Sequence, residues 1–335
     1  MTSQQTLTSA VEASAFDDAI VFAAFLAETP VFALADGRLF FGEAESRHSV
    51  VAHADAGVLV AVSDGARIVT GGDDGRVVAT DVRGAIEEIA NEKGKWIDGL
   101  ALHNGAIAWS AGRVARARSA KGEIKSLDLP STSRGLAFFP KGYRLAVAHY
   151  NGATLWFPNA GTPETLSWSG SHIDATISPD GHFLVTSMQE NTLHGWRLPE
   201  GKHMRMAGYP GKTRSFSWSH DGKWLATSGA DACIIWPFSG KDGPMGKAPR
   251  ECGVRMNVPV TRVAFHPAAL VVAMGYEDGM VMLARISDGS EILVRRPAEN
   301  AAKARISALN WDAKGARLIY GAENGDAGVL SLPKG

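Results

Sequence analysis

The sequence has few cysteines and no long apolar segment. Its two cysteines, Cys233 and Cys252, are too few for a disulfide framework and too far apart for a metal-binding pair. Thiols without such a framework favour a reducing compartment, so we expect a cytoplasmic protein. The first thirty residues hold no Lys or Arg, which argues against a secretory signal. The apolar run at residues 19–26 is shorter than the roughly 20 residues of a membrane helix, so we expect no membrane partner.

The sequence also lacks a charge excess and a catalytic motif. Lys and Arg number 34 against 35 Asp and Glu, so no overall field would draw the chain to nucleic acid. There is no P-loop, no dinucleotide fingerprint and no short motif that pairs a nucleophile with a base. We therefore predict no enzymatic activity, no cofactor, no metal and no nucleic-acid partner.

What the sequence does contain is a repeat. Trp156, Trp196 and Trp236 stand 40 residues apart in two successive steps, within the similar segments HYNGATLWF, MQENTLHGW and GADACIIWP. A period of this length, built from short apolar strands, is typical of an all-β propeller in which each repeat forms one four-stranded antiparallel blade.

Turn residues mark the repeats along the whole chain. Asp or Asn followed by Gly favours a tight hairpin, because these residues tolerate left-handed backbone. One such connection recurs eight times, at Asp36, Asp74, Gly112, Asn151, Asn191, Asp231, Asp278 and Asn324. We favour eight blades, with seven as the alternative because the first and third repeats are the least typical. The expected blades are approximately 14–54, 55–94, 95–130, 131–170, 171–211, 212–258, 259–300 and 301–335.

The last repeat has only three strands of its own. Residues 5–12 form a spare strand candidate at the other end of the sequence. Pairing the two would close the ring with backbone hydrogen bonds and would make residues 1–335 one propeller domain.

The repeats resemble the WD-repeat (Trp-Asp repeat) β-propeller family, on the segments SPDGHFLVTSMQENTLHGW, SHDGKWLATSGADACIIW and GARLIYGAENGDAGVLSL. The family's side-chain network of His, Ser or Thr, Asp and Trp is matched only in fragments. These are His172, Ser187, Asn191 and Trp196 in one repeat, and Ser228, Asp231 and Trp236 in the next. The resemblance implies a non-enzymatic scaffold for protein–protein interactions.

The resemblance also implies a binding face. In this family the first strand of each blade starts on the same face as the turn between the second and third strands. This face surrounds the mouth of the central channel. The positions that match are Trp96, Asp98, Arg134, Tyr150, His172, Asp174, Arg214, Arg262 and Tyr276. Arg, Tyr and Trp often anchor interfaces, and the mixed charges suit a protein or peptide partner. The alternative for these residues is ordinary solvated loops, or packing in the case of Trp96.

Two further alternatives remain open. The channel mouth could bind a small ligand or a metal ion for sensing or hydrolysis, and His149, His172 and Asp174 are the candidate metal ligands. The insertion at residues 239–257, which carries four Lys or Arg and two acidic residues, is either a solvated loop or a partner-docking segment.

Overall fold

The computed structural model describes residues 6–299 and 304–333. Within these ranges the chain is almost entirely β structure, with two short 3-10 helices, η1 (Thr8–Ala10) and η2 (Ala44–Ser46). The contacts divide it into two compact units. Unit 1 comprises Met1–Val51, Arg214–Ser239 and Gly246–Gly335, and unit 2 comprises Ala52–Thr213 and Gly240–Met245.

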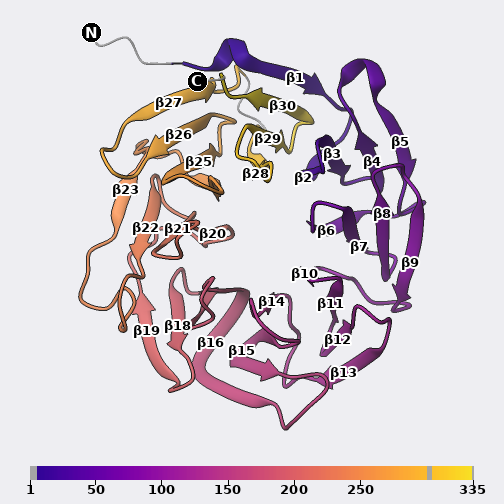
Figure 1. The fold of residues 1–335 in the computed structure, drawn as a ribbon, viewed down its shortest axis with the longest axis vertical. Helices are drawn as coiled ribbons and strands as arrows, with labels where there is room; N and C mark the ends of the chain where they lie inside the picture. The colour runs from indigo at the N-terminus through magenta and orange to yellow at the C-terminus, as the bar shows by residue number, and fades with distance from the viewer. Residues whose placement is uncertain (1–5, 300–303, 334–335) are drawn as a thin grey trace. The chain divides into compact units, whose positions relative to one another are not determined.

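Unit 1 contains four antiparallel sheets, each of four strands that follow one another in space (Figure 1). The first holds β2 (Ile20–Leu26), β3 (Thr29–Leu34), β4 (Arg38–Phe41) and β5 (His48–Val51). The second holds β20 (Phe216–Trp218), β21 (Trp224–Thr227), β22 (Cys233–Pro237) and β23 (Arg250–Cys252). The third holds β24 (Val260–Phe265), β25 (Val271–Tyr276), β26 (Val281–Arg285) and β27 (Glu291–Arg295). The fourth joins β28 (Ile306–Trp311), β29 (Arg317–Ala322) and β30 (Asp326–Ser331) to β1 (Val11–Ala15).

Unit 2 contains two four-stranded sheets and one six-stranded sheet. The first has β6 (Val58–Ser63), β7 (Arg67–Gly72), β8 (Arg76–Asp81) and β9 (Ile86–Asn91). The second has β10 (Gly99–His103), β11 (Ala106–Ala111), β12 (Val114–Arg118) and β13 (Ile124–Asp128). The third has β14 (Leu136–Phe138), β15 (Leu145–Trp156), β16 (Glu164–Ile177), β17 (Phe183–Met188), β18 (Leu193–Arg197) and β19 (Lys202–Met206).

The favoured count of eight blades is wrong. Counted as hydrogen-bonded sheets, the described residues form seven antiparallel propeller blades, six with four strands and one with six. The repeats 131–170 and 171–211 were expected as two blades, but β16 crosses the boundary between them and joins their strands into one sheet. The strand pairing of Tyr150 with Ser171 connects the two repeats within this sheet. A register shift between Tyr150 and Gly152 lies next to this pair. A repeat in the sequence therefore does not always end where a sheet ends.

The N-terminal strand supplies the fourth strand of the last sheet. β1 pairs antiparallel with β30, from Val11↔Leu330 to Ala15↔Asp326. The pairing partner was predicted, but the strand begins later than the expected range 5–12, because residues 8–10 form η1. Residue 5 lies outside the described residues.

Burial follows the position of a strand in its sheet. Every residue of β11, the second strand of its sheet, is buried, because neighbouring sheets of unit 2 cover both of its faces. Every residue of β17 is buried as well. The outermost strands β9 and β13 are mostly exposed. Trp156, Trp196 and Trp236 are all buried at their third-strand positions, which confirms that these tryptophans pack in the core.

Candidate functional site

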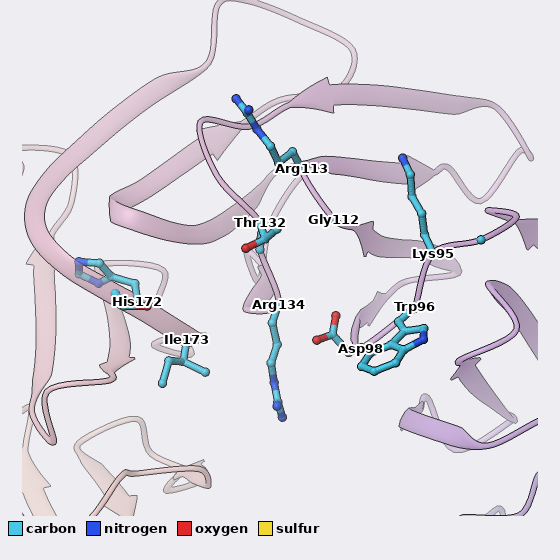
Figure 2. A pocket seen from close by; sticks show the side chains of 12 residues that line it. Lys95, Trp96, Asp98, Gly112, Arg113, Thr132, Arg134, His172 and Ile173 are labelled. Carbon is cyan, nitrogen blue, oxygen red and sulfur yellow. The ribbon is translucent and has the colours of Figure 1, made fainter.

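Four of the predicted site residues line one hollow in unit 2. Trp96, Asp98, Arg134 and His172 border a cavity of about 730 Å³ (Figure 2). The rest of the lining is formed by Gly94, Lys95, Gly112, Arg113, Thr132, Ser133, Ser171 and Ile173. The hollow thus gathers the starts of several first strands, as the alignment of the repeats predicted for this part of the chain.

Trp96 is held outward by the residue that follows it. Ile97 is fully buried among the side chains between two sheets of unit 2, and its backbone N–H donates to the carbonyl oxygen of Gly72 at 3.0 Å. Successive residues of an extended chain point to opposite sides, so the anchored Ile97 turns Trp96 toward solvent. The Trp96 side chain is 68% exposed. The packing alternative for this residue is therefore wrong.

Two glycines allow three charged residues, Asp98, Arg134 and Asp174, to lie in a row. A Cβ atom on Gly99 would lie 2.4 Å from the carbonyl oxygen of Arg134, and a Cβ atom on Gly135 would lie 2.8 Å from the Cα of Asp174. Both distances are shorter than side chains tolerate, so only glycine permits these backbone approaches. As a result, Asp98 and Arg134, which stand just before β10 and β14, lie near Asp174 on β16.

The row contains one ion pair and one carboxylate without a close cation. Arg134 Nε donates to Asp174 Oδ1 at 3.2 Å. Burial raises the pKa of Asp98, and the nearby charge of Asp174 acts in the same direction, while Arg134 opposes it. Asp174 is oriented further by its own backbone N–H, which donates to Ser187 Oγ at 3.3 Å. Asp98 therefore lines the hollow as a carboxylate without an ion pair among the described residues, while Asp174, just outside the lining, is paired with Arg134.

His172 borders the hollow but its ring is already committed, so it does not serve as a contact residue. The side chain is buried, with Nδ1 2.7 Å from Thr186 Oγ1 and Nε2 3.1 Å from the carbonyl oxygen of Trp168. Burial lowers the pKa of His172 and keeps the ring neutral. Its hydroxyl neighbour is Thr186 and not the predicted Ser187, because alternate residues of a strand point to opposite faces.

The most complete histidine network lies in the second repeat, where the sequence did not reveal it. His53 Nδ1 is 3.0 Å from Asp74 Oδ2, and His53 Nε2 is 2.9 Å from Thr70 Oγ1. His53 precedes Asp74 by 21 residues. The spacing of His53 and Asp74 in the sequence is the signal from which this network could have been predicted.

Tyr150 lies outside the hollow, although it is exposed. Its backbone N–H donates to Ser131 Oγ at 2.8 Å, which fixes the turn and leaves the ring in solvent. It stays a candidate contact residue of unit 2.

The three predicted site residues of unit 1 differ in their exposure. Arg214 is exposed. Arg262 is half-buried, and its guanidinium donates to the carbonyl oxygens of Ser307 at 2.5 Å and Arg214 at 3.3 Å. Tyr276 is fully buried, and its hydroxyl donates to the carbonyl oxygen of Gly253 at 2.6 Å. The prediction that Tyr276 contacts a partner is therefore wrong.

Sequence reasoning missed several lining residues, among them Arg113, Thr132 and Ser133. Arg113 follows the turn residue Gly112, so the turn series itself pointed to this position. Thr132 and Ser133 directly precede Arg134 and gave no signal beyond that neighbourhood. The Oγ of Ser133 is buried and has no hydrogen-bond partner among the described residues.

The metal alternative finds no support in the geometry. His149 Nε2 lies 2.9 Å from Thr154 Oγ1, and His172 is bonded as described above. Within residues 6–299 and 304–333, no group of three or more His, Cys, Asp or Glu side chains is placed to hold a metal ion. Over the same ranges, no helix has the length and apolar character needed to cross a membrane.

The cationic residues of the insertion at 239–257 are partly used in packing. The Arg250 guanidinium lies 4.7 Å from the Trp224 ring centroid, and Arg255 forms an ion pair with Asp278 at 2.7 Å. Met256 nevertheless is 81% exposed. The docking role of this segment stays a prediction.

Comparison with known proteins agrees with the repeat architecture. Residues 204–236 match the profile of the family described as WD domain, G-beta repeat. Together with the propeller architecture, this match supports a WD-repeat β-propeller. Telomerase protein component 1 of Mus musculus and that of Rattus norvegicus are each 27% identical to this WD-repeat protein over 204 residues, or 58% of the chain. The chain spans only 7% of the length of these relatives.

A solved structure supports the same fold. The computationally designed Ika8 protein superimposes on this WD-repeat chain with a TM-score of 0.76 and 17% sequence identity. The match covers 95% of this chain and 98% of the designed one. At this identity the likeness concerns the fold alone.

Proposed function

We propose that the protein is a non-enzymatic interaction scaffold that binds a protein or peptide segment at the hollow of unit 2. WD-repeat propellers generally serve as platforms for protein partners, and the family is generally non-enzymatic. The observation that carries the proposal is the exposed Trp96 at the edge of a hollow whose lining combines aromatic, cationic and acidic groups. Such residues dominate binding energy at interfaces.

The two free, buried cysteines support a cytoplasmic location as part of the same proposal. No nucleic acid is proposed as a partner, because the chain's charges nearly cancel and the carboxylates of Asp98 and Asp174 both lie near Arg134.

Capture from a lysate of the source cell tests the proposal. The purified full chain is compared with Trp96→Ser, Arg134→Gln and the double variant, with mass spectrometry of the captured proteins. Ile86→Ser is the matched control, because Ile86 is an exposed apolar residue on the outermost strand β9. We expect a stoichiometric partner that is retained by the control and lost in the double variant.

The melting temperature separates binding from folding. Both altered side chains of the hollow are exposed, so their loss should change stability by less than about 0.5 kcal/mol. A partner captured equally well by the double variant would show that the hollow is not the binding site.

A further inference from the structure

The centre of the hollow differs in charge from its rim. In Figure 2 the carboxylate of Asp98 lies beside the ring of Trp96, whereas the ends of Lys95 and Arg113 point away from these two side chains. Arg134 is engaged with Asp174. A group that enters between the ring and the carboxylate therefore meets an acidic environment, although cations outnumber acids in the lining as a whole.

Two polar atoms, one in the lining and one just behind it, have no partner among the described residues. The Oδ2 atom of Asp174 and the Oγ atom of Ser133 are buried without a hydrogen bond among the described residues. Asp98 is half-buried and forms no ion pair within the same ranges. Buried acceptors without a donor cost free energy, and an incoming donor recovers that cost.

We propose that the hollow takes an arginine side chain of the partner, with its guanidinium stacked on Trp96 and hydrogen-bonded to the carboxylate of Asp98. This assignment rests on the proposed function and specifies the partner's chemistry. A guanidinium gains from both neighbours, because it is attracted to the face of an aromatic ring and donates in parallel to a carboxylate.

Other side chains fit the centre less well. An acidic side chain would meet the carboxylates of Asp98 and Asp174 at close range. A lysine ammonium offers charge, but it is more strongly hydrated and lacks the planar face that stacks on indole. Arginine also carries enough donors to reach a second acceptor, such as Asp174 Oδ2.

A peptide series tests the assignment with the full chain. The probes are the peptides acetyl-Gly-Ser-Ala-X-Ala-Ser-Gly-amide, in which X is arginine, citrulline, lysine or glutamate. Binding is measured by titration calorimetry and by the NMR signal of the Trp96 indole N–H. We expect the arginine peptide to bind best, and the neutral citrulline and the glutamate peptides to bind at least about tenfold more weakly.

Two variants locate the binding. Asp98→Asn keeps the shape of the side chain and removes its charge, so it should weaken the arginine peptide by about tenfold or more and leave the citrulline peptide unchanged. Asp55→Asn is the control, because Asp55 is an exposed carboxylate of unit 2 outside the hollow. It should bind the arginine peptide like the unaltered chain.

The outcomes separate this inference from the proposed function. Equal binding of arginine and citrulline, preference for glutamate, indifference to Asp98→Asn, or no binding at roughly millimolar peptide would each overturn the arginine assignment. If lysate capture still depends on Trp96 in any of those cases, the scaffold proposal stands while its chemistry is wrong. If capture is also independent of the hollow, both fail.

Discussion

Acid should destabilise the protein through one buried histidine. His194 is fully buried on β18, and its ring stacks on Trp168 with 4.0 Å between ring centroids. Neither ring nitrogen has a hydrogen-bond partner among the described residues. Burial lowers the pKa of His194 to about 3, and the nearby His172, His203 and Arg205 act in the same direction.

The sign and size of the effect follow from proton binding. Between the ordinary histidine pKa of 6.5 and about 3, the unfolded chain binds a proton at His194 that the folded chain does not. Stability is therefore complete above pH 6.5 and falls as the pH decreases, by roughly 1.4 kcal/mol per pH unit. Going from about pH 7 to about pH 5 should cost about 2 kcal/mol from this residue alone. The lowered pKa of His172 adds to the loss.

Urea unfolding at several pH values measures this dependence. His194→Phe retains an aromatic ring and removes the titration, so its free energy of unfolding should fall less steeply with acid than that of the unaltered chain. Any cost of the larger ring is a constant offset and does not affect the slope. The same substitution at the exposed His220 serves as the control. An unchanged slope in His194→Phe would refute the reasoning.

Three substitutions in the packed interior have predictable costs in the free energy of unfolding, all measurable by denaturant titration. Gly135→Ala forces a Cβ against the Asp174 backbone and should cost about 1–3 kcal/mol. An unchanged free energy of unfolding would mean that the two backbones can move apart without cost. Trp109→Ala empties a fully buried site and should cost about 3–5 kcal/mol, and a much smaller loss would indicate that the core collapses around it. Tyr276→Phe removes the bond to the Gly253 carbonyl and should cost about 1 kcal/mol or somewhat more, unless water replaces the hydroxyl.

The repeat period and the turn residues were sufficient to predict most of the fold. Asn191 adopts positive φ at the expected turn, and Asn151 does so at the register shift within β15, because their side chains tolerate left-handed backbone. Trp156 is buried against the sheet of β10–β13, and Trp196 is buried among residues of its own six-stranded sheet. These features were predictable because they depend on residues close together in the sequence.

The blade count and part of the site were not predictable in the same way. The fusion of two repeats depends on the pair Tyr150↔Ser171, which joins residues of different repeats and is not encoded by the turn residues themselves. Tyr276 and Asp98 both stand near strand ends, yet one is buried and the other borders the hollow. A shift of one residue reverses the face to which a side chain points, and alignment of repeats does not fix the strand ends to that accuracy.

The same glycines that allow close packing in unit 2 also create the charged row. Gly99 and Gly135 let neighbouring backbones approach. The residues just before them, Asp98 and Arg134, are thereby brought close enough for their charges to interact. Packing depends on the strand interiors, whereas the charges stand at the strand starts, where side chains reach solvent. Substitution at Asp98 or Arg134 can therefore alter recognition while the buried strands keep the fold intact. Under the proposed function, binding specificity and stability would depend on adjacent but different positions of the same strands.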